Sequence, residues 1–184
     1  AQARVRAGDS VTGLAELKSL ASQYTDSAAT SSAAFRAKWI FTRLDGDQSV
    51  PDRLRTLNEM LARAKSETTS AAGAAQSRRV AVDLRRAIAE LIVGSATPVS
   101  SLVTSSLARE NARELVLASE AMFTPTAPQL AHDRLVLAIV LRRQGDEKSA
   151  TELATRAKSV LTRDPEAAPH FRELIAVFDA SGGR

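Results

Sequence analysis

One stretch constrains the fold more than any other: residues 131–165 hold two amphipathic segments separated by a Gly-Asp pair. In each segment apolar residues recur at helical spacing, which predicts two helices that each bury one face. Gly145 suits the left-handed backbone position just past a helix end, and Asp146 can cap the next helix. The stretch is therefore predicted to be a helical hairpin rather than one long helix. The apolar positions are Leu135, Leu137, Ala138, Ile139 and Leu141 in the first segment and Ala150, Leu153, Ala154, Ala157, Val160 and Leu161 in the second, with Asp133, Arg134, Arg142 and Arg143 between those of the first.

The composition favours an all-α fold. Of 184 residues 34 are alanine, aromatic residues make up only 4%, and cysteine is absent. Alanine is the strongest helix former, and almost no run shows the period-two alternation of β-branched and aromatic residues that strands need. Zero cysteines also exclude a disulfide framework and a thiolate metal site.

Gly-Asp pairs recur between amphipathic runs, starting at positions 8, 46 and 145. Such spacing is typical of a chain that turns repeatedly between helices. We expect residues 1–184 to form one all-α domain of about eight or nine helices, mostly antiparallel to their neighbours. Residues 66–123 are its least regular part and residues 131–165 its best repeat.

The 131–165 hairpin resembles the tetratricopeptide repeat, whose signature places Leu and small residues at fixed points on two helices. The resemblance implies antiparallel hairpins stacked as a short right-handed superhelix, which would act as a protein-interaction scaffold or adaptor. A compact helical bundle is the alternative architecture. The matching positions are Leu137, Ala138, Gly145, Asp146, Ala150 and Ala157, and the departures are Arg134 in place of Trp, Leu141 in place of Tyr, Ala154 in place of Phe, and Pro165, which comes three residues late.

The same resemblance implies where a partner would bind, because the first helix of each hairpin lines the concave surface of such a superhelix. With Leu137, Ala138 and Leu141 assigned to internal packing, the remaining residues of that helix are expected to face the groove. Apolar side chains beside paired guanidiniums suit a partner with apolar anchors and a carboxylate. The alternative is that the apolar pair packs against a neighbouring helix and the arginines are solvated. The expected groove residues are His132, Leu135, Ile139, Arg142 and Arg143.

The charge is mildly basic, with 25 Lys and Arg against 21 Asp and Glu. Nucleic-acid-binding domains concentrate basic residues on one stripe, whereas these are dispersed, so a nucleic-acid-binding helical domain is the rival hypothesis rather than the leading one. The arginine pairs at 78–79 and 85–86 are interpreted as a solvated face or as partners for Asp83 and Glu90, in preference to an anion-binding patch. A purely structural subunit of a larger assembly is a third alternative.

No catalytic motif is found. The two histidines, His132 and His170, lack the neighbours of a metal-binding helix, and no nucleophile elbow, phosphate loop or dinucleotide fingerprint occurs. The 45–56 loop alternates oxygen ligands but lacks the Gly and Glu that an EF-hand needs. We therefore expect a non-catalytic protein without a metal or cofactor, whose partner is another protein, a peptide or a second copy of itself.

No run reaches the roughly 18 consecutive apolar residues of a membrane span. The chain nevertheless opens inside the pattern, because residues 1–9 read as the end of a helix that breaks at Gly8-Asp9. We therefore expect an upstream segment, whether a membrane anchor, a signal segment or another domain. Residues 24–35 resemble a junction of the tetratricopeptide subgroup found in bacterial envelope proteins, with Thr25 where that subgroup has Pro, which favours a periplasmic location.

Overall fold

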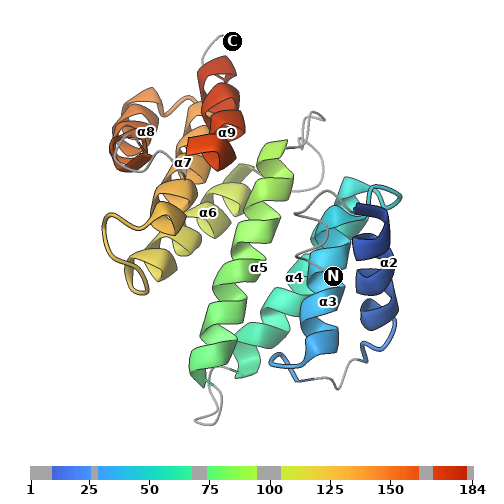
Figure 1. Cartoon of the computed structure of the whole chain (residues 1–184). Coiled ribbons are helices and arrows are strands. Elements are labelled where there is room, and N and C mark those ends of the chain that lie inside the picture. The colour runs from blue at the N-terminus through green and yellow to red at the C-terminus, as the bar shows by residue number, and fades with distance from the viewer. Residues whose placement is uncertain (1–9, 26–28, 68–73, 95–104, 162–167, 182–184) are drawn as a thin grey trace. The chain divides into compact units, whose positions relative to one another are not determined.

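The computed structural model describes residues 10–25, 29–67, 74–94, 105–161 and 168–181, and these residues are almost entirely helical, without a strand among them. The predicted all-α class is confirmed. The sequence also predicts that helices start at Thr97-Pro98 and at Asp164-Pro165, and both positions lie outside the described residues. The described residues form eight helices (Figure 1): α2 (Ser10–Ala21), α3 (Ala33–Leu44), α4 (Val50–Glu67), α5 (Ala74–Gly94), α6 (Ser105–Glu120), α7 (Pro128–Arg143), α8 (Glu147–Leu161) and α9 (Ala168–Ala180).

The chain divides into two compact units, Ala1–Leu91 and Ile92–Arg184. The boundary falls inside α5, so the last turn of this helix belongs to the second unit. It also falls inside the 66–123 stretch that was the least regular part of the sequence. Each unit is described by itself below.

The core of the first unit forms where the apolar faces of its helices meet. Leu17 and Ala21 on α2 pack with Ala37 and Ile40 on α3, and Trp39 lies partly buried beside them. From the sequence, Trp39 is predicted to be a packing residue rather than one that stacks on a ligand, and this position agrees with that prediction. A continuous stripe of α4 is also buried, comprising Leu54, Leu57, Met60, Leu61 and Ala64.

Two side-chain contacts establish the register between α3 and α5. The hydroxyls of Thr30, just before α3, and Ser77, in the first turn of α5, lie 3.0 Å apart. Near the other end of both helices, Arg43 donates to the Glu90 carboxylate at 2.8 Å. Both pairs are 47 residues apart in sequence. Because the same separation holds at both ends, α3 and α5 run in the same direction.

The second unit is organised around α7, which α6, α8 and α9 all contact. Ten of the 16 residues of α7 are buried, on all sides of the helix. A helix that is apolar all round is expected in the interior of a domain. Small side chains let two helices approach closely, and four of them on α7 and α8 are buried, namely Ala138, Ala150, Ala154 and Ala157, each at most 2% exposed.

The predicted hairpin turn between α7 and α8 is confirmed. Gly145 has φ +82°. Its N–H bonds the Arg142 carbonyl, and the Asp146 N–H bonds the Leu141 carbonyl, both at 3.0 Å. This is the Schellman arrangement, which needs a left-handed residue just past the helix end. The Asp146 side chain then accepts from the Ser149 N–H at 3.2 Å and caps α8.

Helices α7 and α9 also run in the same direction. Near their starts, the rings of His132 and Phe171 meet edge to face with centroids 5.8 Å apart. Near their ends, the Arg142 guanidinium lies 4.4 Å from the centroid of the Phe178 ring. Alternate helices along the chain are therefore parallel in both units: α3 with α5 in the first and α7 with α9 in the second.

Candidate functional site

The residues expected to face a groove lie on α7, and the two apolar ones are core residues. Leu135 and Ile139 are both 0% exposed. The expectation that they face a groove is wrong for these side chains, because α7 is covered by three helices rather than by one. The alternative weighed for them, packing against neighbouring helices, describes their positions.

Arg142 is engaged within the second unit. Its guanidinium stacks on Phe178, donates to the Phe178 carbonyl at 2.9 Å, and pairs with Glu147 at 3.1 Å. Lys158 lies near the same ring, 5.3 Å from its centroid, and pairs with Asp179 at 3.2 Å. These contacts hold α9 against the hairpin, so Arg142 has a structural role here.

Arg143 and His132 also contact other parts of the second unit. Arg143 donates to the Ile92 and Val93 carbonyls at 3.4 and 3.0 Å, where the last turn of α5 leaves carbonyls without helical partners. His132 Nδ1 lies 3.1 Å from Asp133 Oδ1. The five groove residues are thus brought together on α7 but are occupied by intramolecular packing and hydrogen bonds. That they bind a partner stays an untested prediction.

A buried polar link was missed by the sequence analysis. Asp133, assigned there to the polar side of its helix, is 0% exposed and accepts a hydrogen bond from Ser119 Oγ at 2.5 Å. Ser119 lies at the end of α6 and is also 0% exposed. Its hydroxyl bonds the carboxylate rather than an imidazole, so the arrangement is not that of a nucleophile and its base. It joins α6 to α7 inside the core.

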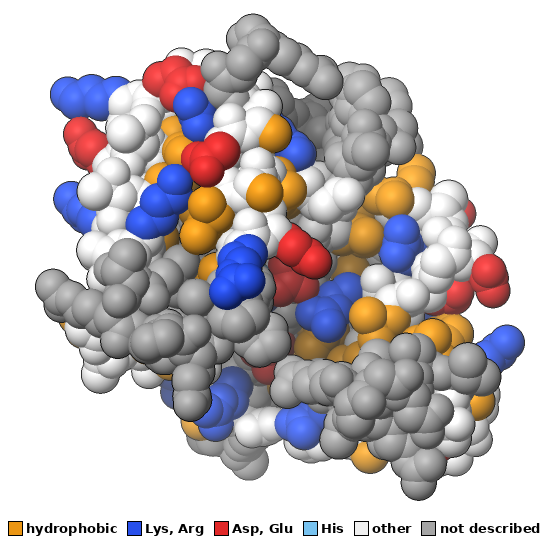
Figure 2. Space-filling view, turned by 45° about the horizontal axis from the view of Figure 1, so that its top comes forward, with side chains coloured by type: hydrophobic (Ala, Val, Ile, Leu, Met, Phe, Trp, Pro, Cys, Tyr) orange, Lys and Arg blue, Asp and Glu red, His pale blue; other side chains and the backbone are white. Residues whose placement is uncertain are grey.

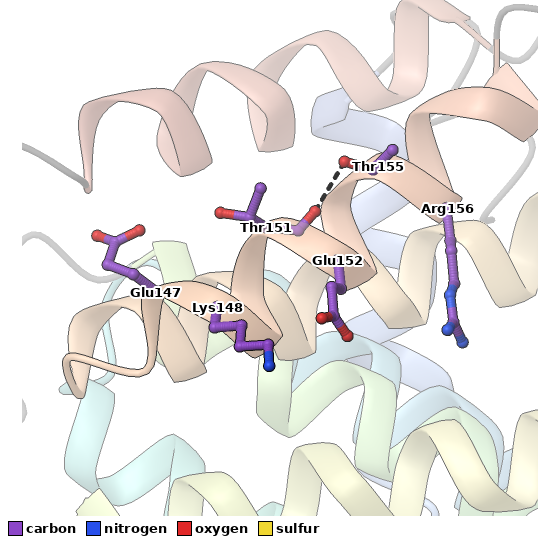
Figure 3. A pocket seen from close by; sticks show the side chains of 6 residues that line it. All are labelled: Glu147, Lys148, Thr151, Glu152, Thr155 and Arg156. Atoms are coloured by element: carbon purple, nitrogen blue, oxygen red, sulfur yellow. Dashed lines mark hydrogen bonds between the residues drawn. The ribbon is translucent and has the colours of Figure 1, made fainter.

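The hollow on α8 is an open surface feature. It has a volume of about 600 Å³, and its six lining side chains all come from one helix (Figure 3). Lys148, Glu152 and Arg156 follow one another at every fourth residue, with Glu152 between the two cations (Figure 3). Such spacing of opposite charges is common on solvated helix faces. The remaining lining residues are Glu147, Thr151 and Thr155.

A second hollow, of about 470 Å³, lies in the first unit beside α3 and α4. Arg63 on its wall donates to the Tyr24 hydroxyl at 3.4 Å and lies 3.5 Å from Glu67. These contacts hold the Arg63 guanidinium inside the unit. The other lining residues are Lys38, Thr56, Glu59 and Met60.

A cluster of charged groups lies where α3 and α5 run side by side. Arg86 pairs with Asp83 at 3.0 Å, which confirms one of the partners expected for the arginines of α5. Glu90, four residues further than Arg86, pairs with Arg43 of α3. Burial raises the pKa of the Asp83 carboxyl, and the nearby charges of Arg86, Arg79 and Arg36 act against that rise. Asp83 therefore contacts Arg86 and lies within electrostatic reach of Arg79 on the same helix and of Arg36 on α3.

Within the described part of the chain, no three metal-binding side chains of His, Cys, Asp or Glu gather at one point. None of its helices is long and apolar enough to cross a membrane.

Comparison with protein-family models, with curated proteins and with solved structures gave no match.

Proposed function

We propose that this protein is a non-catalytic scaffold for protein–protein interactions, built from helical hairpins. The observation that carries the proposal is the parallel alignment of alternate helices, α3 with α5 in one unit and α7 with α9 in the other. In a hairpin array each helix packs on the corresponding helix of the next hairpin, so that alternate helices align. Arrays of this kind offer extended surfaces to protein partners.

The tetratricopeptide resemblance supports the same proposal through the α7–α8 hairpin. The small residues at its motif positions, Ala138, Ala150 and Ala157, are all 0% exposed, and its turn is made by Gly145. The paired positions are 47 residues apart between α3 and α5 and 36 between Arg142 and Phe178. Both exceed the 34-residue period of the tetratricopeptide repeat, so we propose a degenerate relative of that architecture rather than a regular array.

Nucleic-acid binding is the rival function. It requires basic residues gathered into a stripe that follows a phosphate backbone. On the face in Figure 2, basic and acidic side chains are interspersed. Several arginines are also paired with carboxylates, among them Arg43 with Glu90 and Arg134 with Glu120. This charge distribution favours a protein partner.

The test uses the full chain as bait in cross-linking and pull-down from cells that produce it, followed by reconstitution with each purified partner. We expect a defined protein complex that survives moderate salt. Binding to polyanions that collapses between low and moderate salt would instead support the nucleic-acid function. If the chain is recovered only as a fixed subunit with no separable ligand, the scaffold proposal is overturned in favour of a structural role.

A further inference from the structure

We propose that Arg36, Arg79 and Arg86, gathered around Asp83 on α3 and α5, form a docking site for an acidic segment of a partner protein. The inference rests on the proposed scaffold function and adds to it a site and the chemistry of the partner. It is independent of the residues on α7.

The register of the first unit brings these residues together. Contacts between residues 47 apart tie α3 to α5 at Thr30–Ser77 and at Arg43–Glu90. Arg36 and Asp83 have the same separation and lie between those two contacts, so the parallel register places them opposite one another. On α5, residues 79, 83, 86 and 90 follow one another at spacings of four, three and four, which puts them on one helix face.

The charge of this cluster is unbalanced. Arg86 pairs with the single Asp83 carboxylate, the charges of Arg79 and Arg36 also act on it, and the neighbouring Glu90 is already paired with Arg43. Arg36 and Arg79 are exposed, and neither of their guanidiniums makes a hydrogen bond among the described residues. Arg86, by contrast, has a side chain only 17% exposed and is held by Asp83. The site thus combines one fixed guanidinium with two that are open to solvent.

Carboxylates are the groups that such a site fits best. Arginine can hold a carboxylate through two parallel N–H···O bonds. Within the cluster, the Asp83 carboxylate already pairs with one arginine, Arg86. An acidic side chain of a partner would place a second carboxylate between Arg36 and Arg79. A nucleic acid fits less well, because its continuous row of phosphates would meet Asp83 and Glu90 on the same face.

The test measures binding of the full chain to a fluorescein-labelled peptide in which glutamates alternate with serine and glycine. The variant carries Arg36→Ala and Arg79→Ala. The matched control carries Arg113→Ala and Arg156→Ala, which remove the same charge from exposed positions on α6 and α8. Circular dichroism verifies that both variants keep the helicity of the unaltered chain.

We expect the variant to bind the acidic peptide about tenfold more weakly, and the control to bind within about twofold of the unaltered chain. Asp83→Asn should bind several-fold more tightly, because it removes the internal competitor. A peptide with lysine in place of each glutamate should bind neither the unaltered chain nor any of the variants.

Equal losses in variant and control would show attraction to net charge alone and would overturn the site. Failure of the unaltered chain to bind the acidic peptide would overturn it as well. If the chain bound single-stranded oligothymidylate more tightly than the peptide, the cluster would be a nucleic-acid-binding site and the proposed docking site would be overturned. If the Arg36→Ala, Arg79→Ala variant captures the protein partner found by pull-down as well as the unaltered chain does, the scaffold function is supported and the docking site is overturned.

Discussion

The Asp133 carboxylate accepts a hydrogen bond from the Ser119 hydroxyl at 2.5 Å, with both side chains completely buried. A buried carboxylate is tolerated only when hydrogen bonds replace its lost hydration. The Ser119 hydroxyl is one of the groups that replace this hydration, and it links α6 to α7 inside the core.

Ser119→Ala should lower the free energy of unfolding by about 1–3 kcal/mol, because it removes a donor from the buried Asp133. The measurement is urea unfolding followed by far-ultraviolet circular dichroism. Thr155→Ala serves as the control, since this hydroxyl is exposed on α8 and donates only to the Thr151 carbonyl. An unchanged midpoint for Ser119→Ala would mean that water or another group satisfies Asp133.

Ile139→Ala should cost about 2–5 kcal/mol of stability, because it leaves a cavity in the fully buried interior around α7. Leu117→Ala makes the same kind of truncation on α6, where the side chain is 66% exposed, and should change stability by less than about 0.5 kcal/mol. Thermal unfolding of the two variants compares them directly. If Ile139→Ala were as stable as Leu117→Ala, the central position of α7 would be contradicted.

Gly145→Ala should destabilise the hairpin by about 1–2 kcal/mol. Space is not the reason, since a Cβ atom there would meet nothing within 4 Å. The cost arises because φ is +82°, a backbone conformation that disfavours residues with a Cβ. Gly46→Ala is the matched control: its surroundings are equally open and its φ is not in the left-handed region, so it should be neutral or slightly stabilising. Equal effects in chemical denaturation would exclude backbone strain as the cause.

The stability of the first unit should depend on pH through Glu67. Burial alone would raise its pKa, but hydrogen bonds from Thr30 and the charge of Arg63 outweigh burial and lower the pKa below 4.5. A carboxyl with a depressed folded pKa contributes stability that is complete above pH 4.5 and is lost as the pH falls through the folded value. The difference in urea midpoint between the unaltered chain and Glu67→Gln should therefore shrink on acidification.

Fluorescence of Trp39, the single tryptophan, reports this transition because Trp39 lies in the core of the same unit. Glu59→Gln is the control, as it makes the same chemical change at an exposed position on the same helix. A Glu67→Gln difference that stayed constant down to low pH would show that the Thr30 hydrogen bonds do not depend on ionisation.

The sequence by itself determined the helical class and most local structure, because these depend on residues close together in the chain. The spacing of apolar residues predicted the α7–α8 hairpin, and the Gly145-Asp146 pair predicted both its turn and the cap of α8. The sequence also predicts a helix from about residue 28 to Leu44. The structure begins this helix, α3, at Ala33, because Ser32 caps it through a hydrogen bond from the Phe35 N–H at 3.1 Å.

Only the tertiary structure decided which faces are buried and which distant charges meet. The apolar pattern of α7 allowed Leu135 and Ile139 to face either a groove or a neighbouring helix, and three surrounding helices enclosed both. The sequence pattern places Asp133 on the polar side of its helix. In the structure it is buried and accepts a hydrogen bond from Ser119, 14 positions away. Arg36 lies opposite Asp83 because α3 and α5 pack in parallel with a 47-residue register, and helical periodicity carries no information about contacts at that separation.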